Sequence, residues 1–180
     1  MIESARLYDG FADLLKYPGE DYPQTLEQCR RMLVEVNAEA AGFLTGFIEQ
    51  IRGWDTTRLQ ELFVQTFDLN PVCALEVGWH LFGDTYDRGA FLVKMREELR
   101  RYGVAESTEV PDHLTHVLAL LGRMQPEEAD AFAANAVLPA MEKMLAGLEG
   151  KRRPYENVLK AIRAVLAGHH ASVAEEVKHE

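Results

Sequence analysis

The chain has 180 residues, 29 of them acidic and 19 basic, with a formal net charge of -10 and 47% hydrophobic residues. This length fits one globular domain, and the acidic balance disfavours nucleic-acid binding because it repels phosphate. Only two cysteines are present, Cys29 and Cys73, which argues against a disulfide scaffold or a four-cysteine zinc site. Neither a signal-peptide pattern nor an apolar run of membrane-spanning length occurs. We therefore expect a cytoplasmic protein without membrane insertion.

Apolar residues recur at helical spacing through the first half of the chain. Leu7, Phe11 and Leu14 fall on one stripe, which predicts a helix over residues 3–16. The same periodicity predicts helices over about 23–36, 43–51 and 56–67. Residues 68–84 are apolar without a clear stripe, which indicates a loop followed by a short buried helix.

The second half continues in the same way. A long helix is expected from Asp84 or Thr85 to a C-terminal cap at Gly103, and Asp112 is placed to cap the next helix. Pro139 predicts a kink or break within residues 127–149, and a last helix follows Pro154. No segment has the alternation of a strand. The sequence predicts one all-α helical-bundle domain of about eight to ten helices over residues 1–168, with a frayed tail over 169–180.

The search for catalytic chemistry gives little. His113 and His116 have a spacing that two metal ligands can use, but no third ligand lies at a matching distance along the chain. Cys73 and His80 resemble a thiol and its base, yet the apolar surroundings of Cys73 favour simple burial. No phosphate-binding glycine loop occurs. We expect no enzymatic activity, no resident cofactor and no metal site.

Two polar clusters instead suggest a binding surface. The first combines aromatic side chains with an imidazole and carboxylates, which suits a peptide with an apolar helix and a basic end. Its members are Glu76, Trp79, His80, Phe82, Asp84, Tyr86 and Asp87. The alternative is that Trp79 and Phe82 belong to the core. The second cluster is Glu109, Asp112 and His113, in which Asp112 is explained by helix capping, whereas His113 is a titratable group in a first helical turn.

Three stretches give the sequence a family resemblance. They are 67–71 (FDLNP), 79–92 (WHLFGDTYDRGAFL) and 109–114 (EVPDHL). Together they resemble the NarJ/TorD/DmsD superfamily of redox-enzyme maturation chaperones, most closely the NarJ or nitrate reductase delta subunit branch. The resemblance covers roughly residues 5–166 and implies a TorD-like all-helical fold without catalysis.

The resemblance also implies a partner and a site. Members of this superfamily bind the N-terminal leader of a molybdoenzyme's catalytic subunit and hold the subunit until its molybdenum cofactor is inserted. By position, Asp112 and His113 match the motif implicated in leader recognition, and Trp79, Phe82 and Asp84 match the neighbouring aromatic and acidic segment. The Asp87-Arg88-Gly89 sequence favours a nitrate-reductase-type client. Residues 70–73 depart from the familiar pattern, which leaves the client's identity open.

These readings give one main hypothesis and two alternatives. We expect a leader-binding chaperone in which an apolar groove near Trp79 and Phe82 takes the leader helix and nearby carboxylates attract its arginines. The alternatives are a helical adaptor for an unrelated protein and a metal-dependent hydrolase. The sequence leaves the oligomeric state open, a homodimer included.

Overall fold

The computed structural model describes residues 3–170, and within them the regular elements are all helical. The α-helices are α1 (Ser4–Leu14), α2 (Tyr22–Val36), α3 (Ala38–Gln50), α4 (Thr56–Phe63), α5 (Val77–Phe82), α6 (Tyr86–Arg101), α7 (Leu114–Leu121), α8 (Pro126–Phe132), α9 (Leu138–Ala146) and α10 (Tyr155–His169). Two π-helical segments, η1 (Val64–Asp68) and η3 (Ala133–Val137), and the 3-10 turn η2 (Pro71–Cys73) complete them. The predicted all-α fold is confirmed.

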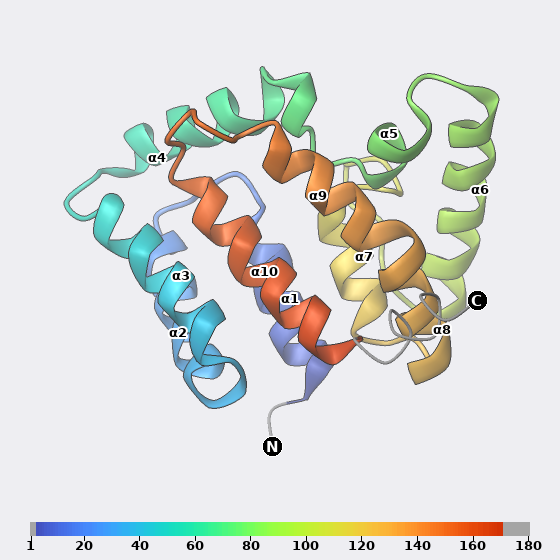
Figure 1. Ribbon diagram of the computed structural model, residues 1–180, viewed down its shortest axis with the longest axis horizontal. Coiled ribbons are helices and arrows are strands. Elements are labelled where there is room, and N and C mark those ends of the chain that lie inside the picture. The colour runs from blue at the N-terminus through green and yellow to red at the C-terminus, as the bar shows by residue number, and fades with distance from the viewer. Residues whose placement is uncertain (1–2, 171–180) are drawn as a thin grey trace.

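Neighbouring helices form a closed circuit around the core. α1 packs on α2 and α7, α3 packs on α2 and α10, and α9 packs on α10 and α5. α6 closes the circuit through α5 and α7. α10 and α9 cross the front of the molecule in Figure 1, with α1 and α7 behind them and α6 at the outer edge. The first and last helices are thus integrated with the middle of the chain.

Local capping explains several helix boundaries. The side chains of Asn37 and Asp55 accept the amides of Ala40 and Arg58 at 3.0 and 2.9 Å, so each supplies one of the acceptors that a helix start lacks. α6 is capped in the same way by Thr85. Such caps contribute on the order of 1 kcal/mol each.

The region around Pro139, where the sequence predicts a kink or a break, changes its hydrogen-bond pattern. Pro139 has no amide hydrogen to donate, and it lies at the start of α9, directly after the π-helical segment η3. The wider hydrogen-bond ring of a π-helix accommodates an interrupted ladder, so α8, η3 and α9 follow one another without a loop. η1 extends α4 in the same manner.

Aromatic side chains join α10 to the first half of the chain. Tyr155, at the start of α10, is fully buried and lies 5.1, 5.8 and 5.0 Å, between ring centroids, from Phe47, Phe63 and Phe67. Tilted and edge-to-face pairs of this kind contribute about 0.5–1.5 kcal/mol each beyond burial. This cluster fixes the position of η1, where Phe67 lies.

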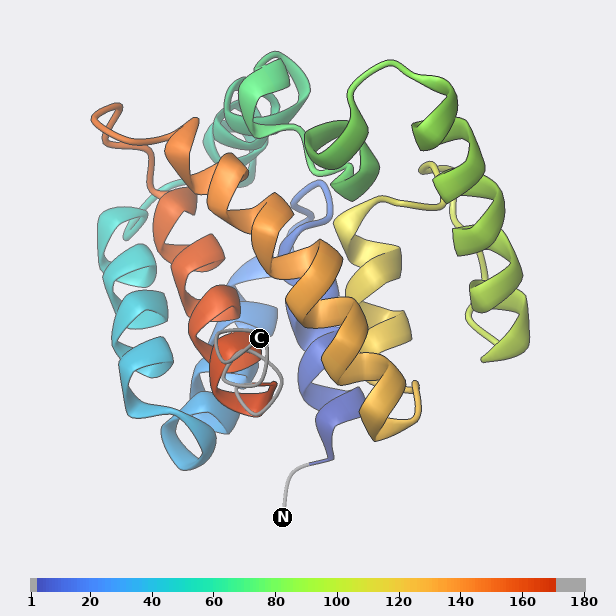
Figure 2. The same cartoon turned by 45° about the vertical axis from the view of Figure 1, so that its right-hand side comes forward.

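α6 is attached much less firmly than α10. Only Met95 and Leu99 of its sixteen residues are buried, whereas α10 buries seven residues. Figure 2 shows α6 as the outermost helix on its side of the molecule. It ends at Arg101, two residues before Gly103, whose φ of 70° is a conformation that glycine adopts without strain.

Two expectations concern the ends and the surroundings of the chain. α10 ends at His169, and the rest of the expected frayed tail, residues 171–180, lies outside the described residues. Within residues 3–170, no helix has both the length and the apolar character required to cross a membrane.

Candidate functional site

A short stretch of backbone pairing joins the start of α5 to the start of α7. Glu76 and His113 form an isolated antiparallel bridge. Beside it, the Val77 amide donates to the carbonyl of Asp112 at 2.9 Å, and the Leu114 amide donates to that of Leu75 at 2.7 Å. These bonds bring together the two polar clusters recognised in the sequence.

Asp112 lies at the centre of this junction and is fully buried. Its Oδ2 accepts the Gly78 amide at 2.9 Å and lies 3.6 Å from Nε of Arg88. Neither Oδ1 of Asp112 nor Nε of Arg88 has a hydrogen-bond partner. Since buried polar atoms are rarely left without a hydrogen bond, these two atoms mark the junction as unusual, although the two side chains are paired as ions.

The predicted role of Asp112 as the cap of α7 is wrong. His113 occupies the N-cap position, and its Nδ1 accepts the Thr115 amide at 3.3 Å. Asp112 instead serves the first turn of α5 through Gly78. Asp112 accepts the Gly78 amide rather than an amide of α7 because the backbone bridge turns the Asp112 side chain towards α5.

His113 is held as a neutral, buried imidazole. Because Nδ1 accepts the Thr115 amide, the proton of the neutral ring is assigned to Nε2, which lies 3.8 Å from the carboxylate of Glu109. Burial, followed by the nearby His116, lowers the pKa of His113 to about 4. The ring therefore presents an N–H donor at neutral pH without a positive charge.

His116 has a structural role. Its Nε2 accepts the Ser107 amide at 3.0 Å, and its Nδ1 donates to the carbonyl of Val110 at 2.9 Å. These bonds fix the loop before α7. Among residues 3–170, no cluster of three or more histidine, cysteine or acidic side chains is arranged to hold a metal ion.

A pocket of about 330 Å³ opens beside the α5–α7 junction, and we call it the acidic pocket. Its walls are Phe67, Asp68, Pro71, Ala74, Leu75, Glu76, Trp79, Arg88, Glu109 and His113. Burial raises the pKa of Asp68 and of Glu76, and the charge of Glu109 raises both further. Three carboxylates thus face one pocket with a single cationic side chain, so a positively charged guest is electrostatically favoured.

Trp79 forms the aromatic wall of the acidic pocket. Its Nε1 donates to the carbonyl of Pro71 at 3.1 Å, and 36% of the residue remains exposed. The Arg88 guanidinium lies 5.9 Å from the ring centroid, within the range of a cation–π contact. An exposed, oriented indole beside carboxylates is well suited to receive a second cation.

The structure gathers only part of the predicted site. Five predicted residues line the acidic pocket, namely Glu76, Trp79, Arg88, Glu109 and His113, and Asp112 lies directly behind it. Other predicted residues, Asp84, Tyr86 and Asp87, are exposed around the start of α6 and do not line this pocket.

The remaining two predicted residues are on other faces of α5. His80 Nε2 donates to the Ala74 carbonyl at 2.6 Å, and burial lowers the pKa of His80. Phe82 packs against Phe91 with 5.6 Å between ring centroids. Phe82 and Trp79 are not buried core residues, which was the alternative interpretation, because both remain more than a third exposed.

Sequence reasoning missed five residues that line the pocket, namely Phe67, Asp68, Pro71, Ala74 and Leu75. Phe67 belongs to an apolar helix stripe and Leu75 to an apolar run, so nothing in the sequence separates them from ordinary core residues. Asp68 carries a weak signal, because it is the acidic residue that ends this stripe just before Asn70 and Pro71.

Comparison with known proteins identifies the family of this chain. The family model described as nitrate reductase delta subunit matches residues 31–176. The chain belongs to the nitrate reductase delta subunit family. The resemblance read from the motifs is thereby confirmed, and all three motifs contribute residues to the acidic pocket.

The individual relatives that match this chain are distant in sequence. The nitrate reductase-like protein NarX, matched in two strains of Mycobacterium tuberculosis, is 26% identical over 150 residues, which cover 83% of this chain. The match covers 22% of NarX, so the chain spans about a fifth of the length of these curated relatives.

A solved structure shares the fold. A crystal structure from Archaeoglobus fulgidus, described as a redox enzyme maturation protein, superposes with a TM-score of 0.63 at 22% sequence identity. The superposition covers 92% of this chain and 94% of the other. The helical circuit described above is therefore the architecture of that protein too.

Proposed function

We propose that this chain is a non-catalytic chaperone for a molybdoenzyme, acting in the cytoplasm. In this role it binds the N-terminal leader of the enzyme's catalytic subunit and holds the subunit for insertion of the molybdenum cofactor and for assembly. Membership of the nitrate reductase delta subunit family and the fold shared with a redox enzyme maturation protein support this role. A nitrate-reductase-type subunit is the client that the family favours.

The observation that carries the proposal is the acidic pocket with unpaired buried polar atoms behind it. Asp112 and Arg88 form an ion pair at 3.6 Å, but Asp112 Oδ1 and Arg88 Nε have no hydrogen-bond partner. A buried polar atom without a hydrogen-bond partner is unfavourable unless a guest or a rearrangement supplies one. A cationic side chain near Glu76 and Glu109 relieves the carboxylate repulsion that raises their neighbours' pKa values.

A binding mode follows from the pocket walls. An arginine of the leader stacks on Trp79 and pairs with Glu76 or Glu109, while the Nε2–H of His113 donates to a leader carbonyl. Apolar contacts of the leader supply most of the affinity, and the carboxylates set the association rate and the orientation. No covalent chemistry is required of the chain.

The test is capture followed by calorimetry. The full-length chain is used to isolate its partner, and the N-terminal peptide of a recovered molybdoenzyme subunit is then titrated into wild type and into Trp79→Ala. We expect Trp79→Ala to weaken binding on the order of tenfold or more. Recovery of a different class of partner, without a molybdoenzyme subunit, overturns the proposal in favour of a general helical adaptor.

A matched variant separates the pocket from general effects. Trp54→Ala also removes a tryptophan, one that lies between α3 and α4 with the Arg58 guanidinium 3.8 Å from its ring centroid. It should leave leader binding unchanged. Equal losses for the two variants would place the site elsewhere. Asp112→Asn retains an acceptor for Gly78 but removes the buried charge, so it tests the electrostatic part separately.

A further inference from the structure

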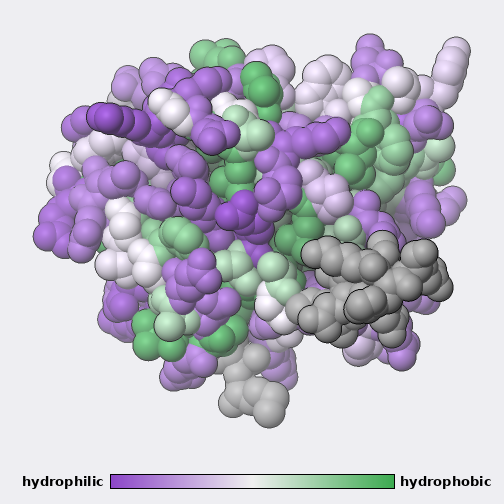
Figure 3. Space-filling model, in the orientation of Figure 1, coloured by the Kyte–Doolittle hydropathy of each residue, from purple (hydrophilic) through white to green (hydrophobic). Residues whose placement is uncertain are grey.

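A basic connection joins α9 to α10 in this acidic chain. Three consecutive cationic residues, Lys151, Arg152 and Arg153, lie between the two helices, and we call them the basic loop. Lys151 and Arg152 are exposed, and Arg153 is partly buried. Arg152 has a φ of 50°, in the left-handed region that residues other than glycine seldom adopt. The connection projects from the molecule in Figures 1 and 2, and hydrophilic residues dominate this part of the surface in Figure 3.

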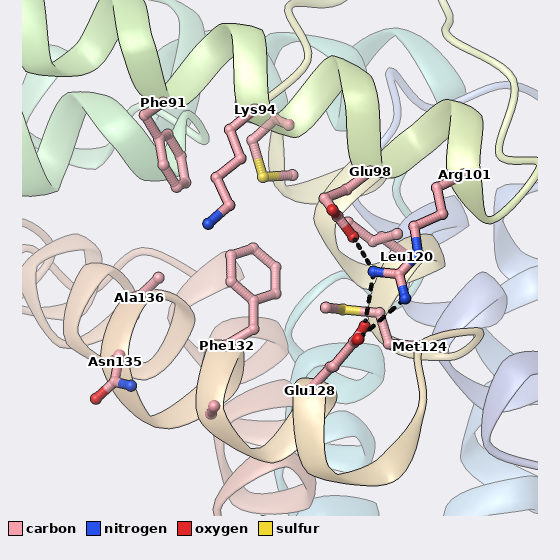
Figure 4. Close-up of a pocket in the computed structure, with 12 residues that line it drawn as sticks. Phe91, Lys94, Glu98, Arg101, Leu120, Met124, Glu128, Phe132, Asn135 and Ala136 are labelled. Atoms are coloured by element: carbon pink, nitrogen blue, oxygen red, sulfur yellow. Dashed lines mark hydrogen bonds and ion pairs between the residues drawn. The ribbon is translucent and has the colours of Figure 1, made fainter.

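The cations of the basic loop have no carboxylate partner in their own copy. Within residues 3–170, none of the three forms an ion pair, and the first acidic residue after them, Glu156, is paired with Lys160 at 3.2 Å. Arg101 shows the contrasting arrangement in Figure 4, where it pairs with Glu98 and Glu128 at 3.4 and 3.0 Å. The basic loop therefore keeps its positive charges available for a partner outside its own chain.

The basic loop lies beside the turn η2, which is also a wall of the acidic pocket. Pro71, at the start of η2, lines the pocket. The end of α9, shortly before the loop, packs so closely on η2 that a Cβ atom added to Gly147 would lie 2.6 Å from the carbonyl oxygen of Val72. Burial raises the pKa of Cys73, the last residue of η2, and two charges of the basic loop act in the opposite direction at that thiol. A positive and a negative surface thus flank one turn.

These two surfaces have opposite charges but do not meet within one copy. The pocket holds the carboxylates of Asp68, Glu76 and Glu109, and no ion pair joins them to the loop within residues 3–170. Two copies related by a two-fold axis present the same pair of surfaces to each other, so that each loop meets the other's pocket. There an arginine finds both carboxylates to pair with and the Trp79 indole to stack on. This arrangement satisfies loop and pocket at once, whereas another anionic partner would satisfy the loop alone.

We propose that two copies of this chain associate about a two-fold axis, with the basic loop of each in the acidic pocket of the other, and that this contact closes the client site while no client is present. The inference rests on the proposed function for what is closed, whereas the contact itself is measured without a client. The net charge of -10 on each copy opposes association over longer distances, so the contact is weak enough for a client to displace.

Sedimentation velocity over a concentration series tests whether the contact forms. Wild type should pass from monomer to dimer by mass action as its concentration rises from low micromolar to near-millimolar, at moderate ionic strength. Growth stops at the dimer because a two-fold contact uses both surfaces of each copy. A wild type that stays monomeric throughout, or that forms larger open assemblies, overturns the proposal.

Charge reversal in separate copies tests which surfaces meet. Arg152→Glu and Glu109→Arg each place like charges opposite one another at both contacts, so each variant alone should associate on the order of tenfold more weakly than wild type. An equimolar mixture should regain the wild-type dimer, because the reversed loop meets the reversed pocket and the two unchanged surfaces meet each other. Both positions are exposed, so neither change disturbs the core. A mixture that stays monomeric, or single variants that dimerise like wild type, overturn the assignment.

Two further variants control for net charge. Arg52→Glu and Glu35→Arg make the same changes of charge at exposed positions after α3 and in α2. Each should dimerise like wild type, alone and in the mixture. Losses equal to those of Arg152→Glu and Glu109→Arg would assign the effect to net charge and overturn the contact.

The leader peptide of the captured subunit tests the closure. It should dissociate the wild-type dimer, and its apparent affinity for wild type should fall as the protein concentration rises, whereas its affinity for Arg152→Glu should stay constant. A peptide that binds the intact dimer overturns the closure. Failure of both proteins to bind any molybdoenzyme leader, with the mixture of variants still forming dimers, overturns the proposed function and leaves the contact between copies standing.

Discussion

Gly78 is the residue on which the two halves of the candidate site converge. Its amide is held by Asp112, and its missing side chain leaves room for Phe91 from α6. Any larger residue would separate α5 from one of these partners. The glycine is required here by close approach rather than by an unusual backbone angle.

Replacement of Gly78 by alanine should therefore destabilise the protein. The added Cβ would meet Asp112 Oδ2 and Phe91 Cδ1, each at 2.7 Å. Overpacking of this kind costs about 1–3 kcal/mol in the free energy of unfolding, measured by urea denaturation. Gly42→Ala is the control, because nothing lies within 4 Å of the added atom and alanine is the better helix former by about 0.5–1 kcal/mol. A Gly78→Ala variant as stable as wild type would contradict the close packing.

The buried imidazole of His113 should make stability depend on pH. Its pKa of about 4 lies below the ordinary value of 6.5, so the unfolded chain binds more protons between these values. The stabilisation is complete above the ordinary value and is lost as the pH falls towards 4. The raised pKa values of Asp68 and Glu76 act in the opposite sense and offset part of this loss.

Urea denaturation at pH about 7 and about 5 measures this effect. The wild-type protein should lose more stability over this interval than His113→Gln, which cannot take up the proton. Equal losses in the two proteins would show that His113 is not the group responsible.

At the residue level, the sequence indicates which side chains are polar or titratable but not which partners they contact. His113 stands out as a titratable group in a first helical turn, whereas Asp112 reads as an ordinary cap because an acidic residue before a helix is normally its cap. The true partner, Gly78, is 34 residues away in sequence. No local pattern reports that contact.

At the scale of elements, α6 buries few side chains for its length. Met95 and Leu99 are its buried residues, Phe91 packs on Phe82, Arg88 pairs with Asp112, and Arg101 and Tyr102 contact Glu128. Exposed ion pairs contribute only about 0–1 kcal/mol, so the Arg101 end is held weakly.

Hydrogen exchange should show this difference. Amides of α6 should exchange about tenfold faster or more than those of α10, because α10 buries seven residues against the core. Addition of the leader peptide should slow exchange in α6 and leave α10 unchanged. Equal protection of the two helices without peptide would contradict the loose attachment of α6.

The positions of the helices were largely predictable, and their irregularities were not. Periodicity located each long helix because apolar residues at helical spacing have a face to bury. The π-helical segments η1 and η3 keep that apolar pattern while changing the hydrogen-bond ring, so the sequence showed them only as helix or kink.

At the scale of the whole molecule, the net charge of -10 creates a field that attracts any cationic leader. The acidic pocket concentrates a small part of that charge, while most acidic residues lie on solvated faces. The field of the whole protein and the charge of the acidic pocket respond differently to salt. At moderate ionic strength, salt screens charges that lie more than about 10 Å from the leader, so the nearby carboxylates of the pocket are affected less.

A pair of charge-neutralising variants separates these contributions. Glu109→Gln and Glu149→Gln each remove one negative charge, the first at the acidic pocket and the second at an exposed position after α9. Stopped-flow association with the leader peptide should slow several-fold for Glu109→Gln and little for Glu149→Gln. Equal slowing would mean that the overall field, rather than the pocket, guides the leader.

The edge-to-face contact of Tyr155 with Phe67 has a consequence for biosynthesis. Phe67 is a wall of the acidic pocket, and the ring that supports it belongs to the last helix of the described chain. A nascent chain still lacking α10 lacks the Tyr155 ring, and Phe67 then packs against Phe63 of α4 without it. We therefore expect this wall to reach its final position only after α10 has been made, so that an unfinished copy on the ribosome competes poorly with finished copies for the leader.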